Sequence, residues 1–406
     1  MALTVAFLTH EPFYPPTGGG SSEAIYLVQE LVRRGHRVRL FCPQVEEPEK
    51  VAREFRVHLE PFTRWRMGRY ARLRNLKYLA FPWFLEQQVA RSVQREPVQV
   101  ILSQHTIASV AAGRLKKRLG ICTVMNYLDF LTGFMEAWPP YVAPPFLLRR
   151  LEHFEVTLPR RYGADGVLAI SDTMAEHLAQ AGCPRERICP IYFGYDPAVF
   201  PLRPPDLVPP PEKPVVVMHG SFDQHHLGPI ALEGMAELVR RRPEVVLRFV
   251  GRETPSLLGF VERLRNQVPH ARVELTGFTP YHEVARHLHT ASVGLVPYEE
   301  TTGTHCAFVA KIVEYLGVGL PVVSTALRSI SRYFADEPLA RFVPFAGRPF
   351  AEAVLHQLQL PHDQQIEWGQ RASARVQREL AWQVISRKAV NFVERVAGDG
   401  SNPRQP

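Results

Sequence analysis

Residues 3–42 read LTVAFLTHEPFYPPTGGGSSEAIYLVQELVRRGHRVRLFC, and this stretch decides the fold class. The apolar runs at 3–9 and 37–42 predict two buried strands. The segment between them predicts a helix that ends near Arg34, because its apolar residues recur three and four positions apart. A strand, a helix and a second strand of these lengths predict a parallel sheet with a right-handed crossover.

The same alternation continues along the chain and predicts an α/β protein. Further strands are expected in the N-terminal half at 98–104, 121–127 and 166–171. Strands are expected in the C-terminal half at 214–220, 245–251, 272–278, 293–298 and 321–325. Helical patterns lie between them, and one long helical stretch is expected at 363–397.

A proline-rich segment separates the two halves. Residues 197–214 contain eight prolines in 18 positions, a composition that is extended and semi-rigid. We therefore expect two Rossmann-like domains that face each other across a cleft. The expected boundaries are 1–196 for the first domain, 197–213 for the linker, 214–378 for the second domain, and 379–406 for a helix packing back on the first domain plus a tail.

The composition excludes several classes of protein. With 406 residues, 46% hydrophobic and 22% charged, the chain has the size and composition of two globular domains. The five cysteines show no CxxC spacing, which indicates neither a disulfide framework nor a zinc knuckle and suggests the cytosol. The opening residues lack the basic region of a signal peptide, and no apolar stretch approaches the roughly 20 residues of a spanning helix.

A glycine-rich loop at 15–21 lies between the first predicted strand and its helix. Glycines let the backbone approach an anion, and a helix start offers unpaired N–H groups. The loop does not read GxGxxG and no acidic residue ends the next strand, so a dinucleotide site is not predicted. A flexible turn is the alternative interpretation.

Lys311 and Glu314 form the second candidate site. Their spacing of three places them on one face of the predicted helix 307–319, just after the carboxyl end of a strand, where open α/β sheets bind ligands. A lysine can neutralise a diphosphate, and a carboxylate can accept hydrogen bonds from ribose hydroxyls. The alternative is a solvated pair on a surface helix.

Three segments resemble the family-four glycosyltransferases of the GT-B fold. The opening stretch quoted above is similar to that family's first strand, glycine loop and RGHxV strand. VLAISDTMAEHLAQAGCPRERICPIYFGYDPAVF at 167–200 resembles the end of its first domain. AKIVEYLGVGLPVVST at 310–325 resembles its donor-site segment KxxEYxAxGxPVV.

The resemblance implies a role for each matching residue. Glu314 would hold the donor ribose and Lys311 would lie beside the diphosphate, without a bound metal or other cofactor. The remaining donor-binding residues expected are Gly18, Gly19, Gly20, Gly220, Ser221, His225, His226, Phe278 and Thr279. The expected catalytic residues are His105, Asp129 and His305.

Three positions depart from the family pattern. Cys306 stands where relatives carry a first glutamate, eight residues before Glu314. Ser221 stands at the arginine of their diphosphate clamp, and Leu128 replaces the histidine that precedes Asp129. His225 or His226, near the lysine of that clamp, could serve the phosphate instead.

These observations predict an enzyme that moves a hexose from a nucleotide sugar to a carbohydrate or lipid-linked acceptor, with retention of configuration. The first domain would bind the acceptor, such as a cell-surface polysaccharide precursor, and the second the donor. One alternative is a nucleotide-sugar 2-epimerase. Another, favoured by Cys306 and Ser221, is a binding protein that has lost catalysis. A nucleic-acid partner is not expected.

The positive charge of the chain is concentrated in one segment. The net charge is +8, and residues 50–118 alone hold 15 basic and 4 acidic residues. Within it, residues 62–84 have six basic residues, several aromatics and no acidic residue. We expect this segment to dock on an anionic membrane at the inner face, with an anionic soluble acceptor or an ordinary helical surface as the alternatives.

Overall fold

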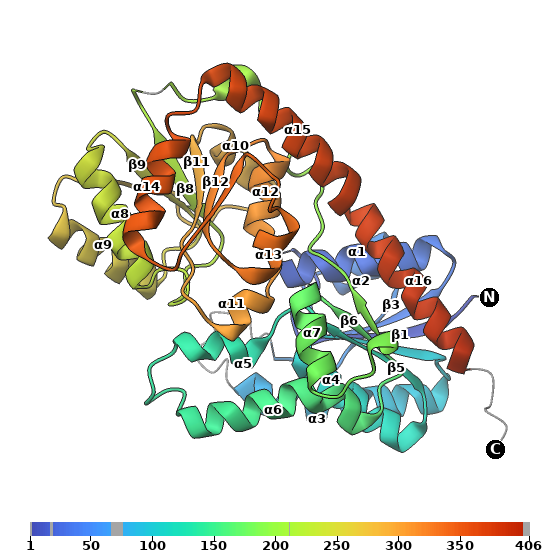
Figure 1. The fold of residues 1–406 in the computed structure, drawn as a ribbon. Coiled ribbons are helices and arrows are strands. Elements are labelled where there is room, and N and C mark those ends of the chain that lie inside the picture. Colours follow the sequence, from blue (N-terminus) through green and yellow to red (C-terminus); the bar gives the residue numbers. More distant parts are fainter. Residues whose placement is uncertain (1, 17–18, 66–75, 211, 401–406) are drawn as a thin grey trace. The chain divides into compact units, whose positions relative to one another are not determined.

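The structure is a computed structural model that describes residues 2–16, 19–65, 76–210 and 212–400. It divides into two compact units (Figure 1). Unit 1 comprises Met1–Thr132, Phe146–Tyr192 and Trp382–Pro406, and unit 2 comprises Gly133–Pro145 and Phe193–Ala381. Each unit is built on one parallel sheet, as the alternating pattern predicted.

The sheet of unit 1 has the strand order β3-β2-β1-β4-β5-β6-β7, and every recorded pairing is parallel. Its strands are β1 (Thr4–Thr9), β2 (Arg37–Cys42), β3 (His58–Pro61), β4 (Val100–Gln104), β5 (Cys122–Tyr127), β6 (Gly166–Ala169) and β7 (Ile188–Pro190). The central strands are buried on both faces, which explains their continuous apolar runs.

The helices of unit 1 cover this sheet. They are α1 (Gly19–Arg33), α2 (Pro48–Phe55), α3 (Leu76–Arg95), α4 (His105–Leu119), α6 (Pro145–Tyr162), α7 (Asp172–Gln180) and α16 (Trp382–Gly400). A short helix, α5 (Leu131–Phe134), spans the boundary of the two units. Apolar residues of α3 and α4, among them Phe81, Leu85 and Ile107, form one core with β1 and β4.

Helix α16 lies far from unit 1 in sequence but packs on its sheet. The ring of Trp382 stacks on Tyr26 of α1 at 4.9 Å between centroids. Arg34 forms an ion pair with Glu394 at 2.6 Å. A Cβ on Gly166 would lie 2.7 Å from the Phe392 ring, so only glycine allows α16 this close to β6.

Unit 2 repeats the same strand order, β10-β9-β8-β11-β12-β13, again with parallel pairings. The strands are β8 (Val215–His219), β9 (Val246–Val250), β10 (Arg272–Leu275), β11 (Val293–Val296), β12 (Val322–Thr325) and β13 (Ala340–Val343). The helices are α8 (Pro229–Arg241), α9 (Pro255–Gln267), α10 (Val284–His289), α11 (Thr302–Cys306), α12 (Ala310–Gly317), α13 (Arg328–Tyr333), α14 (Gly347–Gln357) and α15 (His362–Leu380).

Several elements differ from the sequence-based expectation. The segment after Thr301, which precedes the predicted helix 307–319, folds into the one-turn helix α11, because Thr301 and Thr304 form a reciprocal capping box. The long helix expected at 363–397 is two helices, α15 and α16. They break at Ala381, whose φ of −55° and ψ of 139° are not helical. The short strands β3, β7 and β13 were not predicted.

Two sequence predictions fall on residues outside the described ranges. Gly18 of the glycine loop is one. Part of the proposed membrane-docking segment is the other, since residues 66–75 of 62–84 are not described. In the described part of the chain, no helix has the length and apolar character that crossing a membrane requires.

Candidate functional site

The shared strand order predicts where a ligand site would lie in each unit. In an open α/β sheet, ligands bind outside the carboxyl ends of the two neighbouring strands where the strand order reverses. These strands are β1 and β4 in unit 1 and β8 and β11 in unit 2. The residues that follow these four strands are therefore the first candidates in each unit.

In unit 2, Glu314 of α12 reaches the end of β8. Its side chain is 4% exposed and accepts two hydrogen bonds. His219, the last residue of β8, donates from Nε2 to Oε2 at 2.6 Å, and the Tyr281 hydroxyl donates to Oε1 at 3.0 Å. The Nδ1 atom of His219 is buried without a hydrogen-bond partner among the described residues. The carboxylate is thus fixed at the carboxyl edge of the sheet.

Lys311 lies one helical turn before Glu314 on the same helix. Its Nζ donates to the hydroxyl of Tyr298, which follows β11, at 2.8 Å. Gly220, which follows β8, has a φ of +97°, and a Cβ there would lie 3.1 Å from Lys311 Cε. Glycine at 220 therefore provides both the left-handed turn and the room for the lysine side chain. The Lys311 ammonium group and the Glu314 carboxylate therefore both lie at the carboxyl ends of β8 and β11.

His225 and His226 lie on the loop after β8, beside Tyr298. Both are buried, and their ring centroids are 3.9 Å apart. The His226 ring lies 4.5 Å from that of Tyr298, and its Nδ1 accepts a hydrogen bond from the Asp223 N–H at 3.1 Å. The tautomer of neutral His226 is therefore fixed, with its proton on Nε2. The histidines and Lys311 share Tyr298 as a common neighbour.

The remaining candidates of unit 2 are less closely connected to Lys311. Ser221 follows Gly220 directly and is partly exposed. Phe278, between Gly277 and Thr279 after β10, is 65% exposed, with the Arg252 guanidinium 5.6 Å from its ring centroid. An exposed aromatic ring at this edge could stack on a nucleotide base.

The His305 side chain contacts the start of α13. Its Nδ1 accepts a hydrogen bond from the Arg328 N–H at 3.2 Å, and its Nε2 lies 3.3 Å from Glu300. These contacts give His305 a structural task at the first turn of α13. Cys306, at the position of the relatives' first glutamate, is 2% exposed.

In unit 1, His105 is the most unusual residue at the corresponding edge. It follows β4, is 3% exposed, and has a φ of +65°, a strained conformation for a residue with a side chain. Neither ring nitrogen has a hydrogen-bond partner among the described residues. Its ring packs edge-on against His10, which follows β1, at 5.1 Å, and its Nε2 lies 4.0 Å from Glu11.

Gly20 of the glycine loop makes this arrangement possible. A Cβ on Gly20 would lie 2.6 Å from Glu11 Oε2 and 3.0 Å from His105 Nε2. Gly20 and Gly19 also form the first residues of α1, whose initial N–H groups carry partial positive charge. The glycines thus bring a helix start, a carboxylate and a histidine into contact.

The buried carboxyl group of Glu23 is linked to the glycine loop through Gln104. Glu23 of α1 is fully buried and accepts hydrogen bonds from the amides of Gln104 at 2.8 Å and Asn126 at 3.0 Å. Gln104 also donates to the Gly20 carbonyl at 2.9 Å. Burial raises the pKa of Glu23 to about 7, against the lowering effect of the two amides.

Asp129 lies in the loop after β5, which a second buried carboxylate anchors. Glu155 of α6 accepts hydrogen bonds from the backbone N–H groups of Leu131 and Thr132, at 3.1 and 2.9 Å. Its burial raises the pKa of Glu155. The loop that carries Asp129 is therefore held at its far end.

Sequence reasoning missed His10, Glu11, Glu23, Tyr281 and Tyr298 as candidate site residues. The position of His10 and Glu11 directly after β1, and of Tyr298 just after β11, was a signal that could have found them. No comparable signal existed for Glu23, since a charged residue in a helix is normally read as exposed. Tyr281 comes from a separate turn, so only the fold brings it to Glu314.

Comparisons with known proteins cover most of the chain. The glycosyl transferase 4-like domain matches residues 18–194, and the glycosyl transferases group 1 domain matches residues 213–359. Among curated proteins, WcaL of Escherichia coli strain K12, named as a colanic acid biosynthesis glycosyltransferase, is 28% identical over 237 residues. That match covers 57% of this chain and only 56% of the relative's length.

Solved structures with the same fold match nearly the whole chain. Sucrose-phosphate synthase from Thermosynechococcus elongatus has a TM-score of 0.76 at 16% identity, covering 98% of this chain and 100% of that one. Anabaena Alr3699/HepE, solved with UDP and glucose, has a TM-score of 0.69 at 18% identity, covering 97% and 100%. The predicted fold class, GT-B with two Rossmann-like domains, is confirmed.

Proposed function

Because the chain belongs to the glycosyltransferase family that joins a 4-like domain to a group 1 domain, we propose that it transfers a sugar from a nucleotide-sugar donor to an acceptor hydroxyl. In this reaction the bond between sugar C1 and the donor diphosphate breaks, and a bond between C1 and the acceptor oxygen forms. The acceptor hydroxyl loses its proton, and the diphosphate leaves with the bonding electrons.

The observation that carries the proposal is the pair formed by Lys311 and Glu314 at the carboxyl edge of unit 2. In this proposal Glu314, held by His219, accepts hydrogen bonds from ribose hydroxyls, and Lys311, held by Tyr298, neutralises the diphosphate that develops charge as the sugar leaves. His225, His226, Ser221 and Gly220 complete the donor side. The complexes of HepE with UDP and with UDP-glucose support a uridine nucleotide as the donor.

Unit 1 supplies the acceptor side in this proposal. His105 has two buried ring nitrogens without partners, and a substrate hydroxyl would satisfy one of them and deliver its proton there. Asp129, on the anchored loop after β5, is the second candidate at this edge. We leave His305 out of the catalytic set, because its ring already contacts the start of α13.

The reaction needs no metal in this proposal, because Lys311 and nearby helix starts provide the positive charge. Activity is expected to survive treatment with a chelator. The acceptor is proposed to be a carbohydrate or lipid-linked polysaccharide precursor, which the name of WcaL supports. Retention of configuration is expected, and NMR of the product's anomeric proton tests it.

Calorimetry with UDP, followed by an assay with UDP-sugars, tests the proposal. We expect wild-type protein to bind UDP and Glu314→Gln to bind it about 10- to 100-fold more weakly, the loss of a charged hydrogen bond. Arg348→Gln, an exposed change in the same unit, is the matched control. Unchanged affinity in the Glu314 variant would contradict the assigned donor site.

The product pattern separates the alternatives. A transferase releases UDP and extends an acceptor, whereas a 2-epimerase returns a nucleotide sugar with altered C2 configuration and releases no sugar to an acceptor. A protein that has lost catalysis binds UDP and gives neither product. Buried Cys306 in place of a glutamate is the observation that favours this last alternative.

Location at the inner face of a membrane remains part of the proposal. The segment 62–84 carries six basic residues, and each basic charge near an anionic leaflet contributes about 1 kcal/mol. Sedimentation with anionic and neutral vesicles tests it, with Arg69, Arg72 and Arg74 changed together to Glu. Failure to sediment with anionic vesicles at low salt would contradict membrane docking and favour an anionic soluble acceptor as the partner of these basic residues.

A further inference from the structure

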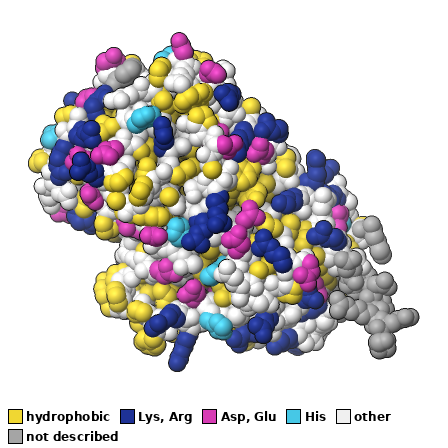
Figure 2. Space-filling view, in the orientation of Figure 1, with side chains coloured by type: hydrophobic (Ala, Val, Ile, Leu, Met, Phe, Trp, Pro, Cys, Tyr) yellow, Lys and Arg dark blue, Asp and Glu magenta, His cyan; other side chains and the backbone are white. Residues whose placement is uncertain are grey.

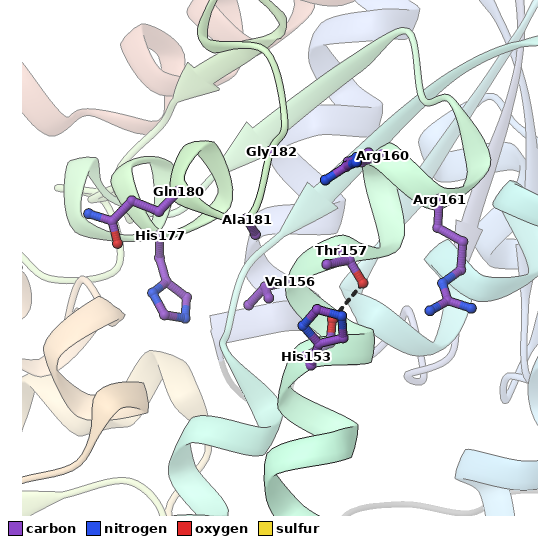
Figure 3. A pocket seen from close by; sticks show the side chains of 9 residues that line it. All are labelled: His153, Val156, Thr157, Arg160, Arg161, His177, Gln180, Ala181 and Gly182. Atoms are coloured by element: carbon purple, nitrogen blue, oxygen red, sulfur yellow. Dashed lines mark hydrogen bonds between the residues drawn. The ribbon is translucent and has the colours of Figure 1, made fainter.

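A cavity lies in unit 1, between helices α6 and α7. It has a volume of about 730 Å³ and is lined by His153, Val156, Thr157, Arg160, Arg161, His177, Gln180, Ala181 and Gly182. Figure 3 shows His153 of α6 and His177 of α7 on either side of Val156, with Arg160 and Arg161 farther along α6. The lining contains four basic or protonatable side chains and no acidic one.

The spacing on α6 explains why these side chains share a cavity. His153, Val156, Thr157 and Arg160 are three, four and seven positions apart, so they lie on one face of the helix. Val156 is buried beneath this face, while the polar residues flank it. Thr157 donates its hydroxyl proton to the His153 carbonyl at 2.5 Å, so the hydrogen-bond donors of this face are the imidazole of His153 and the guanidinium of Arg160.

The guanidinium groups of Arg160 and Arg161 are exposed and are not neutralised by a described carboxylate. Arg160 lies against Gly182, the residue that ends the turn after α7, where an added Cβ would be 2.8 Å from its Nη1. The Arg161 guanidinium lies 5.2 Å from the Phe154 ring. No carboxylate among the described residues pairs with either arginine. One acidic group approaches the cavity, Glu152, whose Oε1 is 3.9 Å from His177 Nε2.

The cavity is distinct from the candidate site at the carboxyl edge. Helix α6 ends at Tyr162, just before β6 begins at Gly166, so Arg160 and Arg161 lie toward the amino edge of the sheet. Helix α7 follows β6 and runs back along the sheet, so its last turn also lies toward the amino edge. In Figure 2, Lys and Arg side chains gather along the lower edge of unit 1, where Figure 1 places α6.

We propose that this cavity binds a phosphate group. Two forked guanidinium groups and two imidazoles match a compact dianion with several acceptor oxygens, and arginine forks suit phosphate geometry in particular. The volume exceeds that of phosphate alone and lies within the range of small-molecule sites, so the phosphate belongs to a larger molecule. This site is independent of the transferase proposal.

The source of the phosphate is either a soluble phosphate monoester or a lipid headgroup. Calorimetry with inorganic phosphate tests the first. Sedimentation with phosphatidylcholine vesicles, with and without phosphatidic acid, tests the second. In both experiments wild-type protein is compared with the double variant His153→Gln, Arg160→Gln and with the control Arg118→Gln, an exposed arginine at the end of α4.

We expect saturable phosphate binding that weakens about tenfold or more in the double variant, the loss of at least one charged hydrogen bond, and stays unchanged in the control. Sedimentation only with phosphatidic acid, lost in the double variant, would support a lipid source. Binding of neither probe, or binding that survives in the double variant, would overturn the proposal. Unchanged thermal melting and UDP affinity distinguish loss of this site from misfolding and from failure of the donor site.

Discussion

The two units share one strand order but prepare their carboxyl edges in opposite ways. In unit 2, the side chains at the edge are already paired: Glu314 with His219 and Tyr281, and Lys311 with Tyr298. In unit 1, His105 keeps two buried nitrogens without partners beside His10 and Glu11. In unit 2 the carboxylate and the ammonium group are held by hydrogen bonds before any ligand arrives, although Nδ1 of His219 is left without one. In unit 1 both ring nitrogens of His105 are left for a ligand to satisfy.

The largest effect is expected from removing the cation of unit 2. In the Lys311→Met variant the leaving diphosphate loses its neutralising charge, so kcat/KM should fall about 100- to 1000-fold. Steady-state kinetics with the best UDP-sugar measures it. Lys213→Met, an exposed lysine of the same unit, should leave the rate unchanged. A near wild-type kcat/KM in the Lys311 variant would show that the contact between Lys311 and Tyr298 has only a structural role.

The buried carboxyl group of unit 1 should make stability depend on pH. The pKa of Glu23 is raised from 4.5 in the unfolded chain to about 7 in the fold, so its protonation stabilises the folded state at low pH. This contribution is complete below pH 4.5 and is lost as the pH rises toward 7, an amount on the order of 3 kcal/mol.

The variant Glu23→Gln cannot lose a proton, so it isolates this contribution. Relative to wild type, its free energy of unfolding should increase between pH 5 and pH 8, about the range over which Glu23 titrates. Urea unfolding at several pH values measures the difference. A difference between the two proteins that stays constant with pH would show that Glu23 titrates near its ordinary pKa despite its burial.

His219 should act on the nucleotide through Glu314. Removing its imidazole in His219→Ala frees the carboxylate from one of its two fixed contacts, and UDP affinity should fall about tenfold. The sharper readout is the penalty for 2′-deoxy-UDP relative to UDP, measured by calorimetry. This penalty should shrink in the variant, because a loose carboxylate selects less well for ribose. An undiminished penalty would indicate that His219 does not position Glu314.

The smallest effect is expected at the glycine loop. In Gly20→Ala the new Cβ meets the ends of the Glu11 and His105 side chains, which can shift, so activity should fall about three- to tenfold with little loss of stability. Gly398→Ala, where a Cβ meets nothing within 4 Å, is the control. Equal activity in both variants would show that the close packing of Glu11 and His105 against Gly20 does not matter for catalysis.

Much of this fold follows from local patterns in the sequence. Continuous apolar runs such as VAFL and VVVM predicted the central strands of both sheets, because strands buried on both faces need apolar side chains throughout. Edge strands such as β3 and β13 escaped prediction, because they are short and carry polar residues. The break at Ala381 escaped it as well, since neither glycine nor proline marks that position.

The site was predictable only in part, for a physical reason. Lys311 and Glu314 share one helix face, so their spacing alone brings them together. His219 and Tyr281 come 95 and 33 residues before Glu314 and meet it only through the sheet and a turn. For His305 the reverse holds: its position in the sequence suggested a place in the site, but its ring accepts a hydrogen bond from the start of α13.

The packing of α16 on unit 1 has a consequence for how the chain folds as it leaves the ribosome. Unit 1 starts with the first strand, yet its sheet stays uncovered beside β5 and β6 until residues 382–400 have been translated. The nascent chain must therefore hold an apolar face open throughout synthesis of unit 2, during which chaperones and aggregation compete for it. A stop codon before Trp382 would remove less than a tenth of the residues but leave the earliest-made unit permanently unfinished.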